Sequence, residues 1–259
     1  MTEQELLISG ALPEHPHVAQ ILLNRPPNNF LDIDLIQRLA DALESLDEAG
    51  QCRAVVLSAV GRNFCAGVNF GDRKTSESDD PIGEFYAHAE RIFFQPIPIV
   101  AGVGGSAVGG GMGLALAADV RVAGPSSRFA ANFSRLGFHH GFGLSLTLPN
   151  AVGRARATEI LMSGRMLYAD EALSSGLVTS IANDENILDS ATELAIGIAE
   201  AAPLAVRSIR MTMRSRFLED LKDAMTHEKA EQYRLQGTAD FRAGIRASLK
   251  REVPVFIGS

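Results

Sequence analysis

The segment Ile97–Asp119, with the sequence IPIVAGVGGSAVGGGMGLALAAD, is the part of the chain around which the rest is organised. Its beginning, up to Val103, is rich in β-branched residues and predicts a buried strand. The glycine triplet Gly109–Gly111 follows, and the leucines and alanines after it predict a helix. The first N–H groups of a helix have no internal partner and carry its positive dipole end, and glycines let a ligand come close. The segment therefore predicts a place that binds an anion or a developing oxyanion.

Two other interpretations of this segment compete with the oxyanion loop. No charged residue lies between Arg91 and Asp119, as in a transmembrane helix, but the glycines and two prolines argue against a continuous span. Residues Gly102–Ala107 match G-x-G-x-x-A, a dinucleotide-binding pattern that normally needs an acid at the end of the next strand. Asp119 instead precedes the next predicted strand. Motifs elsewhere in the chain are needed to choose between the oxyanion loop, the transmembrane helix and the dinucleotide-binding loop.

The composition sets broad limits on the fold class and on the partners. At 259 residues and 46% hydrophobic residues, the chain is one large domain, or one domain with a helical extension. A net charge of −7 makes nucleic acid or an anionic membrane an unexpected partner. Cys52 and Cys65 have no metal-binding spacing, and no metal site is expected. The N-terminus lacks the basic start and apolar run of a signal peptide, so we expect a cytoplasmic protein.

Strands and helices alternate in the first half of the sequence, and helices dominate the second half. A glycine-containing loop, GFHHGFG, is expected over 137–143. This order predicts an α/β fold with a helical C-terminal region. The predicted strands cover 18–23, 54–59, 97–103, 120–123 and 128–131, and the predicted helices cover about 32–49, 84–94, 144–163, 169–175, 186–201, 203–217, 218–236 and 238–250.

Three segments together resemble the crotonase family, also called the enoyl-CoA hydratase/isomerase family. Ile21–Leu43, ILLNRPPNNFLDIDLIQRLADAL, is similar to the family's I-x-L-N-R-P opening. Ala54–Phe70, AVVLSAVGRNFCAGVNF, is similar to its V-V-L-x-G-x-G-x-x-F-C-A-G-x-D motif. Gly104–Ala123, GGSAVGGGMGLALAADVRVA, is similar to its N-G-x-A-x-G-G-G-x-x-L-A-x-x-C-D motif. The order and spacing of the three segments carry the resemblance.

The resemblance implies a crotonase-like spiral of β-β-α turns followed by a C-terminal helical region that drives trimer assembly. Residues 1–200 would form the spiral core with an acyl-CoA site, and 201–259 the helical region. A homotrimer or a dimer of trimers (a hexamer) is then expected, acting in fatty acid metabolism. The substrate would be an acyl-CoA thioester, with coenzyme A as part of the substrate and no further cofactor.

The resemblance also implies an oxyanion hole of two backbone N–H groups that hold the thioester oxygen. By the motifs these belong to Val68, just after Ala66 and Gly67, and to Gly110, the middle glycine of the triplet. Ala66 would line the substrate pocket. This agrees with the oxyanion reading of the central segment, and backbone donors need no particular side chain.

The chain departs from the family at two positions where hydratases carry glutamates. Gly113 and Phe133 stand there, so the space left by glycine and the wall made by phenylalanine predict a roomy, apolar pocket. General acid–base catalysis needs a titratable group near the reacting proton, so ordinary two-glutamate hydration is in doubt. His140 is the first candidate for a replacement proton carrier near neutral pH and His139 the second. The alternative is that one or both histidines only pack or hydrogen-bond structurally.

The phosphates of coenzyme A call for basic side chains at the entry to the site. The resemblance places such contacts at Arg25, Pro27 and Asn28, at Arg73 and Lys74, and at Lys250. For each cation the alternative is an ordinary surface charge.

The sequence thus predicts an enzyme of the hydratase/isomerase family that acts on an acyl-CoA thioester through a backbone oxyanion hole, without the usual two glutamates. Hydrolysis of the thioester, or C–C cleavage as in a lyase, is an alternative reaction of the same fold. A binding module that has kept the pocket and lost the chemistry is an alternative of another class.

Overall fold

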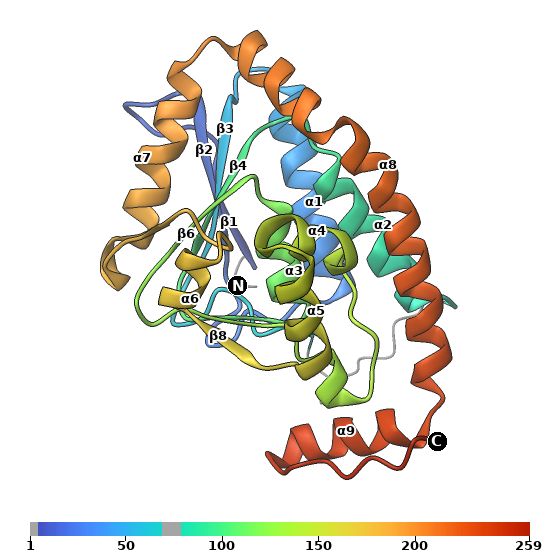
Figure 1. The fold of residues 1–259 in the computed structure, drawn as a ribbon. Coiled ribbons are helices and arrows are strands. Elements are labelled where there is room, and N and C mark those ends of the chain that lie inside the picture. Colours follow the sequence, from blue (N-terminus) through green and yellow to red (C-terminus); the bar gives the residue numbers. More distant parts are fainter. Residues whose placement is uncertain (1–4, 69–78) are drawn as a thin grey trace.

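The computed structural model describes residues 5–68 and 79–259, in which the strands form two sheets (Figure 1). The larger sheet has six strands in the order β1-β2-β3-β4-β6-β9. β1 runs antiparallel to β2, and the other neighbours are parallel. The smaller sheet has the order β5-β7-β8. The strands are β1 (Leu6–Ser9), β2 (Val18–Leu23), β3 (Ala54–Ala59), β4 (Ile99–Val103), β5 (Ser106–Val108), β6 (Val120–Ala123), β7 (Arg128–Ala130), β8 (Met166–Tyr168) and β9 (Ser180–Ile181).

Helices cover both faces of the larger sheet, which explains why its central strands are apolar runs without alternation. On one face, Val56, Val100 and Val122 pack against the alanines of α7. On the other face, strand residues such as Leu57 join the main core with α1, α2 and α3. The helices are α1 (Ile33–Glu48), α2 (Pro81–Phe93), α3 (Gly110–Ala117), α4 (Leu144–Val152), α5 (Arg154–Ser163), α6 (Ala169–Ser174), α7 (Ile187–Glu200), α8 (Pro203–Gln236) and α9 (Ala239–Lys250), with 3-10 turns η1 (Asn132–Leu136) and η2 (Asp184–Asn186).

The central segment folds as β4, then the short strand β5, then α3. Asp119, at its end, accepts hydrogen bonds from the Ile99 N–H (2.8 Å) and from Arg210 Nε (3.0 Å), and forms an ion pair with Arg214. The acid is therefore an anchor between β4 and α8. No helix in the described part of the chain has both the length and the apolar character that a membrane crossing needs.

α8 runs along the side of the molecule, next to α2 and α4, and α9 turns away beneath it (Figure 1). The prediction of two helices over 203–217 and 218–236 is wrong, since α8 is continuous and no glycine or proline interrupts it between Pro203 and Gly237. The helix predicted over 144–163 is instead divided at Gly153, whose φ is +81°. The strands β1, β5, β8 and β9 are short and were not predicted. The division of the chain at residue 200 stays a prediction.

Candidate functional site

Two turns that are far apart in the sequence lie side by side, and both carry residues expected at the site. Cys65 donates its N–H to the Ser106 carbonyl (2.9 Å), and its own carbonyl accepts from the Val108 N–H (2.9 Å). This pairing brings the turn Ala66–Val68 beside Gly109 and Gly110. A Cβ atom built on Gly67, where φ is +93°, would lie 2.8 Å from the Val108 oxygen and 4.0 Å from the Gly110 nitrogen.

The three glycines of the triplet differ in how strictly their positions require glycine. A Cβ on Gly111 would lie 2.2 Å from the Cys65 oxygen, so the two turns can approach only if this residue is glycine. Gly109 has a φ of +56° and donates its N–H to the Ala130 carbonyl (2.8 Å). Gly110, the first residue of α3, has room for a methyl group, since the nearest atom to its Cβ would be Leu31 Cδ1 at 3.4 Å.

Hydrogen bonds fix the directions of the two candidate N–H groups. The Gly67 carbonyl accepts from the Leu31 N–H (2.8 Å), and in a trans peptide the Val68 N–H then points the opposite way. The Gly109 carbonyl accepts from the N–H groups of Met112 (3.1 Å) and Gly113 (3.2 Å), which turns the Gly110 N–H out of the helix end. Neither N–H has an acceptor within residues 5–68 and 79–259. Both are therefore available to an oxygen atom of a ligand.

The space expected at Gly113 is not empty, so the prediction of a roomy pocket at this position is wrong. A Cβ on Gly113 would lie 2.5 Å from Phe142 Cβ and 2.8 Å from its Cγ. Phe142 is 2% exposed and has a φ of +62°, a conformation that few residues other than glycine adopt. The aromatic ring of Phe142 thus replaces the side chain that Gly113 lacks.

This contact leads to a prediction about stability. Gly→Ala inside a helix ordinarily stabilises a protein by about 0.5–1 kcal/mol. We expect Gly113→Ala instead to lower the free energy of unfolding by about 1–3 kcal/mol, because the new methyl group overlaps Phe142. Gly110→Ala is the matched control in the same helix, with space for the methyl group. Urea unfolding at one protein concentration compares the two, and a Gly113→Ala protein more stable than the control would contradict the packing.

Phe133 lies beside the turn that carries Gly110. It is half-buried in η1, and its Cζ would be 3.8 Å from a Cβ on Gly109. α9 in turn covers η1. The ring of Phe138, just after η1, lies 4.7 Å from the ring of Phe241 in α9, measured between centroids. The C-terminal helix therefore supports the segment that presents Phe133.

The two histidines stack on each other, with ring centroids 4.1 Å apart, and contact α4 and α8. His140 Nε2 is 2.8 Å from Ser145 Oγ, while the His139 ring meets His227 edge to face at 5.9 Å. Burial lowers the pKa of His139 and lowers that of His140 to about 4. Titration of His140 near neutral pH, as expected from the sequence, is therefore wrong, and this side chain is uncharged at pH 7. The described contacts of the pair do not include either oxyanion turn.

Glu228 of α8 is a buried carboxylate that the sequence analysis missed. It is 0% exposed and accepts the N–H groups of Gly143 (2.8 Å) and Ser145 (2.7 Å) at the start of α4. Burial raises the pKa of this carboxyl to about 7, although the bonds from Ser145 and Gly143 oppose the shift. Its position among the buried residues Leu221, Met225 and Gln232, at helical spacing, was the signal in the sequence.

The residues expected to contact coenzyme A occupy different environments. Arg25 forms ion pairs with Glu5, Asp32 and Asp34, so its charge is already compensated. Pro27 is exposed, and the carbonyl of half-buried Asn28 accepts from the Ala66 N–H (2.9 Å), which holds the first turn. Lys250 is exposed at the end of α9. Arg73 and Lys74 lie outside the described residues.

Asn29, next to this group, was also missed. It is fully buried, and its side-chain amide donates to the carbonyls of Val60 (3.0 Å) and Asn63 (2.7 Å). Its φ of +48° is one that asparagine adopts more readily than most residues. Asn29 thus ties the segment after β2 to the loop that leads into the first turn.

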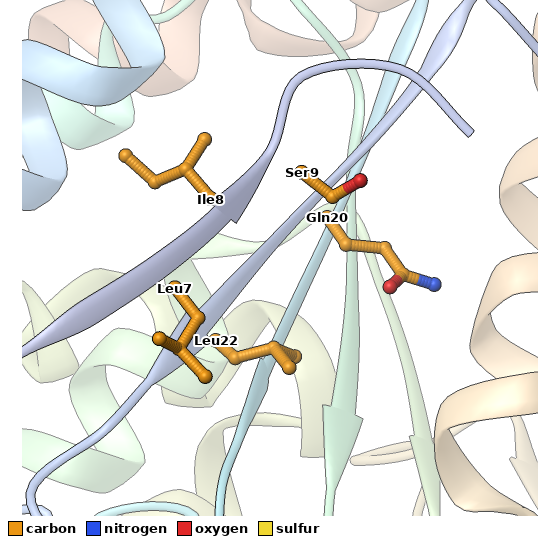
Figure 2. Close-up of a pocket in the computed structure, with 5 residues that line it drawn as sticks. All are labelled: Leu7, Ile8, Ser9, Gln20 and Leu22. Carbon is orange, nitrogen blue, oxygen red and sulfur yellow. The ribbon is translucent and has the colours of Figure 1, made fainter. Parts of the chain in front are cut away.

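A hollow lies on the larger sheet, over strands β1 and β2 (Figure 2). Leu7, Ser9, Gln20 and Leu22 line it together with Ile8, all from β1 and β2. Gln20 donates to Thr192 Oγ1 of α7 (2.9 Å), so the hollow adjoins the part of the face that this helix covers. It shares no residue with the candidate site.

Known proteins of one family match this chain over nearly its whole length. The family model for enoyl-CoA hydratase/isomerase matches residues 14–258. The 1,2-epoxyphenylacetyl-CoA isomerase of Escherichia coli K12 is 31% identical over 252 residues, covering 93% of this chain and 95% of that protein. The probable enoyl-CoA hydratase EchA12 of Mycobacterium tuberculosis H37Rv is 33% identical, covering 96% and 93%.

Solved structures give the same result for the fold. An enoyl-CoA hydratase/isomerase from Pseudoalteromonas atlantica T6c superposes with a TM-score of 0.89 at 32% identity, over 98% of this chain and all of that one. An enoyl-CoA hydratase from Mycobacterium avium subsp. paratuberculosis K-10 superposes with a TM-score of 0.85 at 27% identity, over 98% of both chains. The predicted α/β fold with a helical C-terminal region is thus confirmed as the crotonase fold, and the chain belongs to the enoyl-CoA hydratase/isomerase family.

Proposed function

We propose that this protein is an enzyme that binds an acyl-CoA thioester and stabilises negative charge on the thioester oxygen with the N–H groups of Val68 and Gly110. One observation carries the proposal: the N–H groups of Val68 and Gly110 have no acceptor in the described residues. The carbonyl of the same peptide unit accepts hydrogen bonds from other residues in each case, and this fixes the direction of the N–H. Donors that are fixed before the reaction need no reorganisation as charge develops, which is the main source of their catalytic effect.

In this mechanism, a base takes a proton from the carbon next to the thioester, or a carbon substituent leaves that carbon without the electron pair of the broken C–C bond. Either step leaves an enolate, whose oxygen lies between the two N–H groups. Attack of water on the thioester carbon would place a tetrahedral oxyanion at the same point. Ala66 and Phe133 flank the reacting atoms in either case, and coenzyme A enters as part of the substrate with no further cofactor.

We propose that the reaction does not use the two glutamates of the family's hydratases, because Gly113 and Phe133 stand at those positions. Hydration or isomerisation by another proton carrier is the first choice, with thioester hydrolysis or C–C cleavage as the alternatives. His140, and then His139, are the candidate carriers. Burial lowers the pKa of His140 to about 4, so at pH 7 its imidazole is uncharged and free to accept a proton, as a weak base; Ser145 Oγ lies 2.8 Å from its Nε2.

Contacts with coenzyme A remain proposals for Pro27, Asn28, Arg73, Lys74 and Lys250. Arg25 is better suited to holding this segment than to binding phosphate, because it already pairs with carboxylates.

A cytoplasmic homotrimer or dimer of trimers is proposed for the assembly. The apolar side chains that α8 and the C-terminal residues expose support it. Leu204, Met213 and Val253 belong to this group, with exposed fractions of 82%, 78% and 91%.

Binding is the first test of this function. We expect acyl-CoA to bind in calorimetry and NAD not to bind. The G-x-G-x-x-A residues run through β4 and β5 and open no helix, and Asp119 is held by Ile99 and Arg210. Free coenzyme A is the control that separates binding of the acyl group from binding of the nucleotide. Tighter binding of NAD than of acyl-CoA would contradict the proposal.

A non-catalytic binding module is the second candidate, favoured by the missing carboxylates. A turnover screen over a panel of acyl-CoA thioesters separates it from the enzyme, since the module would bind members of the panel and convert none.

A further inference from the structure

Phe142 is a buried aromatic residue in an unusual backbone conformation, close to Gly110 and Gly113 of α3. Its Cδ2 would be 4.0 Å from a Cβ on Gly110, and its Cβ 2.5 Å from a Cβ on Gly113. The ring packs edge to face on Phe85, at 5.8 Å between centroids, and in a tilted arrangement on Phe93, at 6.0 Å. A cluster of three aromatic rings thus lies next to Gly110, which carries one of the proposed oxyanion donors.

Glu228 fixes the peptide that follows Phe142. The Gly143 N–H, which belongs to the same peptide unit as the Phe142 carbonyl, donates to Glu228 Oε2 at 2.8 Å. Glu228 Oε1 accepts from Ser145 at 2.7 Å, so one carboxylate binds both sides of the turn. Gln232, one turn further along α8, donates to the His139 carbonyl at 3.1 Å. α8 therefore holds the turn that presents the ring.

We infer that Phe142 limits the depth of the acyl pocket, so that the protein selects thioesters with a short acyl group, and that Glu228 is the positioning residue that holds Phe142 there. This rests on the proposed function, because it needs the thioester oxygen at the Gly110 N–H. An acyl chain that extends from that point toward α3 meets the ring. Gly113 has no side chain that could close the pocket if the ring of Phe142 were removed. The depth of the pocket therefore depends on Phe142 alone.

The test compares the Kd values of butanoyl-CoA and octanoyl-CoA by calorimetry. In the unmodified protein we expect the shorter thioester to bind more tightly. Phe142→Ala should change the ratio of the two Kd values at least about tenfold in favour of octanoyl-CoA, since a few methylene groups in an apolar pocket give at least that discrimination. Phe142→Leu should give a smaller change in the same direction, and it serves as the test if the alanine variant does not fold.

Two further variants separate pocket depth from general loosening of the core. Phe217→Leu shrinks another ring that packs on Phe93, at 6.3 Å between centroids, and should leave the ratio unchanged. Glu228→Gln keeps one acceptor oxygen, so one of the two N–H groups loses its partner. We expect it to shift the ratio in the direction of Phe142→Ala while the Kd of free coenzyme A stays the same.

The outcomes distinguish this inference from the function on which it rests. If the unmodified protein binds neither thioester, the proposed function fails and the inference fails with it. If both thioesters bind and the ratio is the same in the unmodified protein, Phe142→Ala and Phe142→Leu, the function stands and the role of Phe142 is overturned. A ratio that moves equally in Phe217→Leu would overturn it as well.

Discussion

Replacing Gly110 by proline should lower the turnover of the protein's acyl-CoA substrate by about 10²–10³. Proline has no N–H, so one of the two proposed donors to the thioester oxygen is lost. The fold should survive because Gly110 is the first residue of α3, the helix position that tolerates proline best. The measurement is a steady-state rate on the best substrate of the acyl-CoA panel, with circular dichroism to check folding.

Gly110→Ala is the matched control for this prediction. It keeps the N–H and adds a methyl group 3.4 Å from Leu31 Cδ1, an ordinary contact. We expect a rate within a few-fold of the unmodified protein. A folded Gly110→Pro protein with undiminished turnover would mean that the thioester oxygen is bound elsewhere.

Hydration of crotonyl-CoA should be very slow, even where the thioester binds. General acid–base groups contribute about 10²–10⁴ each, and neither Gly113 nor Phe133 carries one. The loss of the enoyl-thioester absorbance measures this rate, with a two-glutamate hydratase assayed beside it as the reference. We expect a rate at least about 10⁴ below that reference. Rapid hydration by the unmodified protein would contradict the assignment of these two positions.

Variants of His140 and His139, assayed on the protein's own substrate, test whether a histidine carries the proton in place of the missing glutamates. His140→Gln removes the titration and keeps a polar side chain near Ser145, and we expect it to lower the rate more than His139→Gln does, because His139 is the second candidate. Because the pKa of His140 is lowered to about 4, a base at this position is active above that pH and loses activity as the pH falls through it. Full activity in the double glutamine variant would exclude both residues.

The parts of the fold that the sequence predicts well are those set by local patterns. Apart from Ser58, the run at Ala54–Ala59 is apolar because both faces of the strand are covered, and α1 follows the helical spacing of its leucines. Short strands were missed, since the three residues of β5 carry too little pattern to separate them from a glycine turn. The split of α8 was an error of the opposite kind, because its exposed, mixed surface has no sharp periodicity.

The candidate site likewise has residues that local patterns predict and residues that depend on contacts between distant parts of the chain. The glycine turns could be predicted because backbone donors leave a signature of glycines at fixed spacing. Gly111 is part of this signature because the Cys65 carbonyl lies where its side chain would be. The role of Phe142 could not be predicted, since it depends on a contact with Gly113 across the fold and on an unusual φ. The spacing of Glu228 along α8 indicates that it is buried, but no local pattern records its hydrogen bond from the Gly143 N–H, which lies far away in the sequence.

The proposed oxyanion site is tested most directly by the infrared spectrum of a bound acyl-CoA whose thioester carbonyl carbon is ¹³C-labelled. Hydrogen bonds from Val68 and Gly110 polarise this carbonyl and weaken its double bond. We predict that its stretching band moves to lower frequency on binding to the unmodified protein and to Gly110→Ala, and that much of this shift is lost in Gly110→Pro. A carbonyl band at the same frequency in solution and in the complex with the unmodified protein would contradict the account.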